Sequence, residues 1–160
     1  IFFIFLLTFI IASCSENIIY NEQHELKSGI WDIEDSFVFN ANINDTINLY
    51  DIFIDLEINK EFLTNNLWLF IETRSPSGNN LTDSVMYFIT DDKGKWFGKE
   101  KRNSVQYKLL YKPMILFPET GEYVFTLKHV MREGDLPYIK SLGITVSETK
   151  FSVNPEDTSE

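Results

Sequence analysis

One cysteine, Cys14, is the residue of this sequence best suited to covalent chemistry. It follows Ile11, Ala12 and Ser13, an aliphatic residue and two small ones, at the end of an apolar run that begins at Ile1. Small side chains allow a peptidase to approach the backbone, and only a thiol can form a thioether with a diacylglycerol. The pattern resembles a bacterial lipobox, so we interpret Cys14 as a lipid attachment site that carries acyl chains such as palmitate.

The apolar run itself predicts a targeting segment. It is shorter than the ~20 residues that a membrane-spanning helix needs, and its length is typical of the apolar region of a secretory signal peptide. We therefore expect residues 1–13 to be a lipoprotein signal peptide. The sequence has no initial Met and no charged segment before the run, so we expect the signal peptide to be truncated at its N-terminus. The alternative is a buried apolar strand or helix that ends in Cys by chance.

Other residues that could do chemistry form no recognisable pattern. The sequence has only two histidines, His24 and His129, and its single cysteine excludes an internal disulfide and a CxxC metal site. Adjacent carboxylates such as Asp91-Asp92 fall in turns, where solvated acids are common. No G-x-S-x-G nucleophile motif is present, although a Ser-His-Asp triad has no fixed spacing and stays open. We expect no enzymatic activity, no cofactor and no metal.

A basic cluster on this acidic chain is the first candidate binding site. It surrounds Trp96 and comprises Lys93, Lys95, Trp96, Lys99, Lys101 and Arg102. Such a cluster could bind an acidic partner, lipopolysaccharide or peptidoglycan. The alternative is a solvated hairpin in which Trp96 belongs to the core.

Two further features could carry recognition. The segment from Met131 to Leu142 is a long connection of mixed character, and long loops often bind partners in β-sandwiches. A simple crossover between two sheets explains it equally well. Trp31, Trp68 and Trp96 could form a platform on which sugars stack, but their separation in the sequence favours core positions for at least two of them.

The overall charge limits the partners. The net charge is -10, with a pI near 4.6, which disfavours binding to nucleic acid and electrostatic adhesion to anionic lipid. We expect attachment to a membrane through the N-terminal lipid, and no binding of nucleic acid.

Short alternating segments dominate the remainder of the chain. Apolar and polar residues alternate with period two over residues 36–43, 52–59 and 122–130, while both faces are apolar at the start of residues 67–74, which predicts a central strand. Further strands are expected over residues 84–90, 105–111, 114–117 and 142–147. Regular spacing without an amphipathic helix predicts an all-β fold, an antiparallel β-sandwich of jelly-roll or immunoglobulin-like topology. We assign residues 14–29 to the lipidated cysteine and a flexible tether, residues 30–150 to this single domain and residues 151–160 to a polar tail.

A series of short motifs gives a family resemblance over about Trp31 to Val146. They are NLWLFI at residues 66–71, DKGKWFG at 92–98, FPETGEY at 117–123 and LPYIKSLG at 136–143. Their order and spacing resemble the gliding motility lipoprotein GldH family of Bacteroidetes, with one departure: Tyr138 stands where a Gly is expected.

The resemblance implies a non-enzymatic envelope lipoprotein required for gliding, a scaffold or accessory of the gliding and type IX secretion machinery. It transfers only Cys14, as the lipid attachment site, and implies other envelope proteins of that machinery as partners. Ser15, in place of the Asp that retains some lipoproteins in the inner membrane, favours the outer membrane. We expect the domain to face the periplasm, with the medium as the open alternative. A carbohydrate- or peptidoglycan-binding lipoprotein is the alternative function.

Overall fold

The computed structural model describes residues 16–150, and these residues form only strands, turns and loops. In this part of the chain, no helix is long and apolar enough to cross a bilayer. The strands are β1 (Ile18–Glu25), β2 (Ile30–Trp31), β3 (Phe37–Ile43), β4 (Tyr50–Asn59), β5 (Asn66–Arg74), β6 (Asn80–Phe88), β7 (Lys99–Glu100), β8 (Ser104–Ile115), β9 (Gly121–His129), β10 (Leu136–Pro137) and β11 (Ile139–Glu148).

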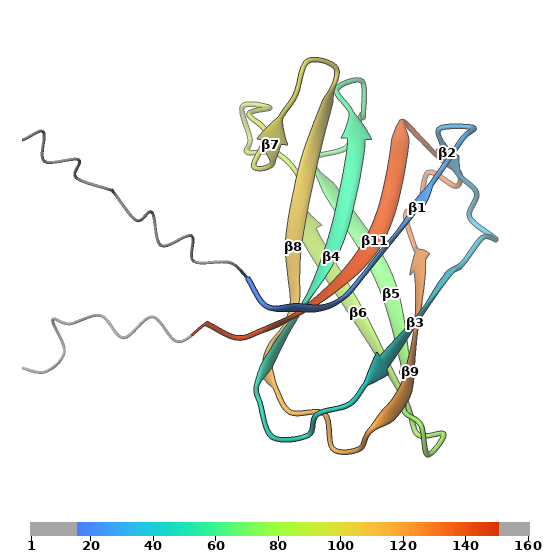
Figure 1. The fold of residues 1–160 in the computed structure, drawn as a ribbon. Helices are drawn as coiled ribbons and strands as arrows, with labels where there is room; N and C mark the ends of the chain where they lie inside the picture. The colour runs from blue at the N-terminus through green and yellow to red at the C-terminus, as the bar shows by residue number, and fades with distance from the viewer. Residues whose placement is uncertain (1–15, 151–160) are drawn as a thin grey trace, which may run out of the picture.

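Two antiparallel sheets pack face to face. The five-stranded sheet has the order β1-β11-β4-β8-β7 and the four-stranded sheet the order β3-β9-β5-β6, while β2 and β10 form a short ribbon (Figure 1). The eight long strands switch between the sheets at almost every connection, and only β5 and β6 form a hairpin within one sheet. This interleaved order is the jelly-roll topology. Of the two β-sandwich topologies that the sequence left open, the structure therefore has the jelly-roll and not the immunoglobulin-like one.

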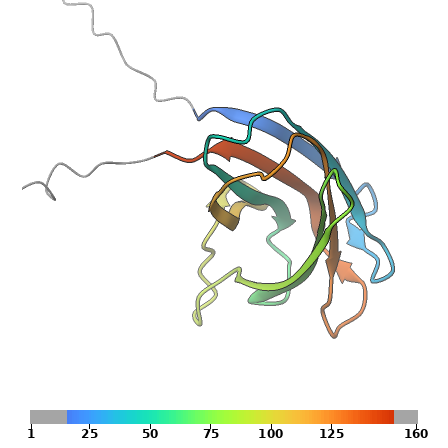
Figure 2. The same cartoon turned by 90° about the horizontal axis from the view of Figure 1, so that it is seen from below.

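The core forms because apolar side chains alternate along the strands and are buried between the two sheets. Figure 2 shows the two sheets facing each other, seen from below. In β4, Ile52, Ile54, Leu56 and Ile58 are buried. In β9, Tyr123, Phe125, Leu127 and His129 are buried in the same way. The strands expected over residues 36–43, 52–59, 67–74 and 122–130 are confirmed within two residues at each end.

The flexible tether expected over residues 14–29 is wrong for much of its length. Ile18–Glu25 forms β1, an edge strand that pairs with β11 from Ile18↔Ser147 to Glu25↔Ser141. From Tyr20 onward, every second residue of β1 is half-buried. An edge strand needs to bury little of its surface, so its residues can be mostly polar, and the strand was therefore not recognised from the sequence. The globular domain therefore begins near Ile18, not at residue 30.

Three other segments differ from expectation. Strand β6 starts at Asn80 rather than Ser84, and β8 runs without interruption through Pro113. Pro113 is tolerated because β7 pairs only with Val105 and Gln106, which leaves the rest of β8 at the sheet edge, and because the register with β4 shifts nearby. The long connection expected over Met131–Leu142 is shorter, since Leu136 and Pro137 pair with β2 and β11 begins at Ile139.

Side chains close one open side of the sandwich, between β6 and β8. Tyr111 donates a hydrogen bond to Asp83 at 2.6 Å, and Lys112 forms an ion pair with the same carboxylate at 2.8 Å. The hydroxyl of Tyr87 donates to the carbonyl oxygen of Leu110 at 3.2 Å. These contacts join edge strands of different sheets, which backbone hydrogen bonds do not connect.

Candidate functional site

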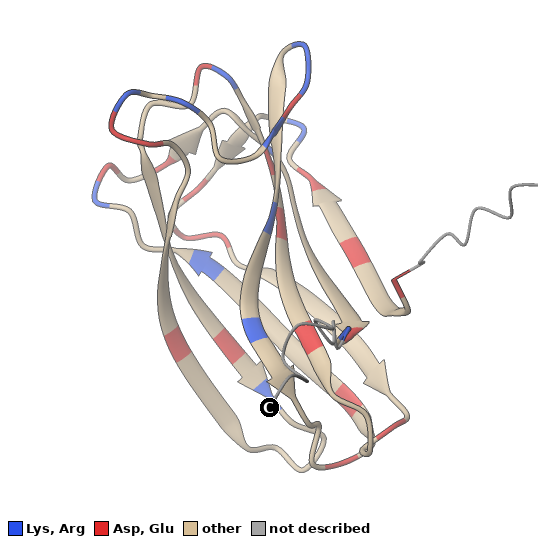
Figure 3. Cartoon of the chain, turned by 90° about the vertical axis from the view of Figure 1, so that its left-hand side faces the viewer, with Lys and Arg blue, Asp and Glu red and all other residues tan. Residues whose placement is uncertain are grey.

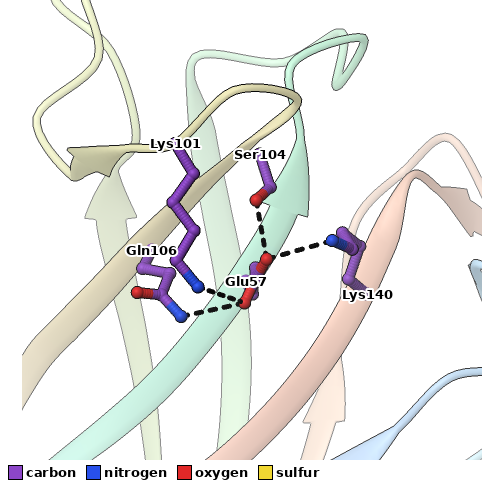
Figure 4. Close-up of polar contacts among 5 residues, drawn as sticks. All are labelled: Glu57, Lys101, Ser104, Gln106 and Lys140. Atoms are coloured by element: carbon purple, nitrogen blue, oxygen red, sulfur yellow. Dashed lines mark hydrogen bonds and ion pairs between the residues drawn. The ribbon is translucent and has the colours of Figure 1, made fainter.

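The outer face of the five-stranded sheet carries carboxylates that lie among donors. Glu57 projects from β4, and its two oxygens accept hydrogen bonds from Ser104 at 2.6 Å, Gln106 at 2.9 Å and Lys140 at 3.1 Å (Figure 4). Lys101 adds an ion pair at 3.6 Å. Burial opposes ionisation, but these donors outweigh it and lower the pKa of Glu57 to about 2. At neutral pH, Glu57 is thus a charged link between β4, β8 and β11.

Asp55, two residues earlier on β4, lies in a different environment. Burial raises the pKa of its carboxyl, against the hydrogen bond from Thr145 and the nearby charge of Lys108. A pair of carboxylates with opposite pKa shifts is a feature of some acid–base sites. Here the oxygens of Glu57 are occupied by two lysines and two neutral donors, so Glu57 links neighbouring strands of the sheet.

The basic cluster predicted from the sequence lies on two loops at one end of the sandwich. Lys93 and Lys95 belong to the turn that Asp91 organises by accepting hydrogen bonds from both backbone N–H groups, at 2.9 and 2.8 Å. Lys99, Lys101 and Arg102 belong to β7 and the turn into β8, and Lys101 is paired with Glu57. Basic and acidic residues are interspersed on the loops at this end (Figure 3). No single basic surface results, and partner binding by these residues stays a prediction.

Trp96 joins this cluster to the core. It forms an isolated bridge with Thr90, which is the beginning of the expected hairpin but not a full strand, and its half-buried ring packs on the core. Trp31 is fully buried and contacts the ring of His129 at a centroid distance of 5.1 Å. The three tryptophans therefore do not form one platform, and only Trp68 presents much of its ring to solvent.

Both histidines pack against aromatic residues of the fold. His129 is buried, and its Nε2 lies 3.2 Å from the carbonyl oxygen of Trp31. Burial lowers the pKa of His129, which favours the neutral ring. His24, expected in the tether, belongs to β1 and packs edge-on against Phe39 with ring centroids 4.9 Å apart. Residues 16–150 contain no group of three or more His, Cys, Asp or Glu that could hold a metal ion.

The outer face of the four-stranded sheet carries a surface that brings together residues which the sequence analysis considered separately, among them Trp68 and Met131. Trp68 and Phe70 project from β5 with 42% and 45% of their surface exposed, and Met86 and Ser84 are their partners on β6. A groove of about 510 Å³ follows these rings, and we call it the β5 groove. Its lining residues are Asn66, Trp68, Phe70, Ser84, Val130, Met131, Arg132 and Glu133.

A signal for the β5 groove was present in the sequence. Apolar residues on both faces of residues 67–71 predicted a central strand, and β5 does lie between β9 and β6. A central strand need not be covered on both faces: the rings of Trp68 and Phe70 on the outer face of β5 stay 42% and 45% exposed. Part of the predicted recognition loop, Met131 to Glu133, borders the groove.

The family model described as "GldH lipoprotein" matches residues 18–146, which begins at the first residue of β1. This chain belongs to the GldH lipoprotein family.

Curated relatives of the GldH family match over most of the chain. A protein named "Gliding motility lipoprotein GldH homolog" from Christiangramia forsetii is 32% identical over 158 residues, 97% of this chain and 95% of the relative. The protein named "Gliding motility lipoprotein GldH" from Flavobacterium johnsoniae is 27% identical over 150 residues, 92% of this chain and 91% of the relative. The crystal structure of dimeric latent PorU from Porphyromonas gingivalis matches 89% of this chain and 15% of its own, with 11% identity and a TM-score of 0.39. That likeness is too weak to support an inference.

One departure from the GldH pattern has a structural meaning. Tyr138, where the resemblance predicts a Gly, has φ of 72°, in the left-handed region that glycine adopts most easily. Its backbone carbonyl accepts a hydrogen bond from Asn59 at 2.8 Å, and its half-buried side chain packs on the core. Cys14 and the signal peptide, like the tail over 151–160, lie outside the described residues.

Proposed function

We propose that this GldH family protein is a lipid-anchored scaffold or accessory of the gliding and type IX secretion machinery. It is attached through Cys14 to the outer membrane and faces the periplasm. The names of the relatives support a gliding motility lipoprotein, and the lipobox pattern supports the anchor. On this proposal the domain works without an active site, by binding other envelope proteins.

One observation carries the scaffold proposal: the distribution of covered and open side chains on the two sheet faces. The charged side chain of Glu57 on β4 is only 16% exposed, whereas the apolar rings of Trp68 and Phe70 are far more open. Exposed aromatic side chains in a groove mark interaction surfaces, and Trp and Arg are enriched among residues that dominate binding energy. The β5 groove combines Trp68, Phe70 and Arg132 in this way.

The first test is genetic. A clean deletion should abolish colony spreading without slowing growth, and the wild-type gene should restore spreading. A Trp68→Thr, Phe70→Thr double variant should fold and be exported at normal levels but should fail to restore spreading. The matched control is Val38→Thr, which changes an exposed apolar residue on the same sheet face outside the groove. Normal spreading of the deletion strain would contradict the gliding function, and normal spreading of the double variant would contradict the role of the groove.

The second test concerns the anchor. Metabolic labelling with a fatty-acid analogue should modify the wild-type protein and leave Cys14→Ser unlabelled. Label on both proteins, or on neither, would contradict attachment at Cys14.

Carbohydrate binding is the second candidate, and the lining of the β5 groove favours it. The ring faces of Trp68 and Phe70 could stack on the apolar face of a sugar ring, while Asn66, Ser84, Arg132 and Glu133 supply hydrogen-bonding groups beside them. Sedimentation with purified peptidoglycan separates the candidates. A glycan-binding protein should sediment with the polymer and lose this property in the Trp68→Thr, Phe70→Thr variant, whereas a protein scaffold should remain in solution.

A further inference from the structure

The described chain begins on the outer face of the five-stranded sheet, next to β8. The carboxylate of Glu16 forms an ion pair with Lys108 at 2.6 Å, and the backbone N–H of Glu148 donates to the carbonyl oxygen of Asn17 at 2.9 Å. Figure 1 shows this first segment crossing the lower end of β8. Only Ser15 separates Cys14 from Glu16 in the sequence, so a lipid on Cys14 would be tied directly to this end of the domain.

Apolar side chains are exposed along the same end of β8. Leu110, Met114 and Leu116 are 47%, 58% and 52% exposed, and we call this surface the β8 edge. Lys108 and Lys112 lie in the same stretch, each beside an aromatic ring. The edge thus combines apolar side chains and long basic ones, although the net charge of the chain is -10.

Met114 has an unusual backbone for an exposed apolar residue. Its φ is 48°, in the left-handed region that costs a side chain roughly 1 kcal/mol or more. Its N–H is fixed by the carboxylate of Asp51 at 2.8 Å, so the turn holds the methionine side chain outward. The exposed side chain contributes little burial within the domain, which points to a contact outside it.

We propose that the β8 edge rests on the lipid surface that holds the acyl chains of Cys14. The proposal depends on the proposed anchor, because the short connection from Cys14 to Glu16 keeps the start of the domain next to the headgroups. Such a tether converts a weak surface contact into an intramolecular one. Apolar side chains then enter the headgroup boundary while the lysine heads remain in the polar layer. The β5 groove, on the opposite outer face, is left open for a partner.

Site-specific fluorescence on the full-length, acylated protein tests this orientation. Cys14 is the only cysteine of the sequence, and the thioether would block it, so an introduced cysteine is the only free thiol. Met114→Cys and Leu116→Cys would carry a nitrobenzoxadiazole probe, and Val38→Cys on the four-stranded sheet is the matched control. In vesicles of phosphatidylethanolamine and phosphatidylglycerol, we expect a several-fold rise in emission at 114 and 116, strong quenching there by nitroxide-labelled lipid, and neither effect at 38.

Three other outcomes would contradict the proposal, and the measurements distinguish them from one another. Low emission at all three positions in a protein that carries acyl label would show that the β8 edge faces water while the anchor stands. A protein without acyl label would remove the anchor and the surface contact together. Emission that rises with protein density and resists the nitroxide lipid would assign the edge to a second copy of the chain.

A second variant guards against insertion caused by the probe itself. Leu110→Ser and Leu116→Ser, combined with the probe at 114, should reduce the quenching by more than half. Unchanged quenching would show that the probe, not the β8 edge, seeks the lipid.

Discussion

The outer faces of the two sheets reverse the usual distribution of side chains. On β4, Asp55 and Glu57 are polar yet half-buried, because neighbouring strands direct hydrogen-bond donors toward them. On β5, Trp68 and Phe70 are apolar yet exposed. Large apolar residues normally lie inside and charged ones outside.

The outer face of the five-stranded sheet therefore contributes to the stability of the fold, whereas the outer face of the four-stranded sheet is free to bind a partner. The carboxylates of Asp55 and Glu57 on β4 are satisfied by residues from β8 and β11 and by Lys101 in the turn before β8, so this face adds to the cohesion of the sheet. The rings of β5 are surrounded by few groups of their own domain, and burying them requires another molecule.

We expect the largest loss of stability from adding a side chain where two strands of the five-stranded sheet lie close together. A Cβ added at Gly143 on β11 would lie 2.6 Å from the backbone oxygen of Glu22 and 2.6 Å from Cγ of Gln23. Gly143→Val should therefore push β1 away and lower the free energy of unfolding by about 3 kcal/mol. Urea denaturation measures this loss, and Thr82→Val on the exposed face of β6 should change stability by less than about 0.5 kcal/mol. Equal effects would show that the two faces are packed alike.

Removing a charge should also distinguish the faces. Glu57→Gln should lower the free energy of unfolding by roughly 2 kcal/mol at pH 7, because Lys101 and Lys140 lose their partner. Glu72→Gln on the open face of β5 is the control and should have little effect.

The same variant has a defined pH dependence. The folded pKa of Glu57, about 2, lies below its ordinary value of 4.5, so its contribution is complete above the ordinary pKa and is lost as pH falls from about 4.5 toward 2. The difference between the wild-type protein and Glu57→Gln should shrink between pH 7 and pH 3. A difference independent of pH would mean that packing, rather than charge, is responsible.

Changes on the aromatic face should separate function from stability. Trp68→Thr and Phe70→Thr should each change the free energy of unfolding by less than about 1 kcal/mol, because the rings are half-exposed and Thr favours strands. Colony spreading should nevertheless fail. A large loss of stability would show that these rings hold the sheet together and would weaken the case for a binding surface.

Relief of backbone strain should give the smallest effect. Met114→Gly should raise the free energy of unfolding by about 0.5 kcal/mol, because glycine adopts positive φ without steric cost. The opposite exchange at Gly78, which has φ of 89° and open space around it, should lower stability by about 1 kcal/mol on change to Ala. A destabilised Met114→Gly protein would show that the methionine side chain serves the fold, contrary to its proposed contact with lipid.

Several elements could be read from the sequence because their pattern is local. Alternation in β4 and β9 fixed which residues face the core, and the motif series led to the GldH family. Strand β1 could not be read in this way, because an edge strand with only partial burial has a nearly polar sequence. The jelly-roll order could not be read either, because strand pairing depends on contacts between residues far apart in the chain.

The division between sequence and structure is clearest at the candidate surfaces. Residue types at short spacing predicted the strand content, the buried face of most strands and the family, whereas the anchor at Cys14 stays a prediction. The folded domain alone shows that Glu57 is enclosed by Lys101 and Lys140 while Trp68 and Phe70 stay open. Exposure depends on what the neighbouring strands place beside a residue, and those strands are distant in the sequence.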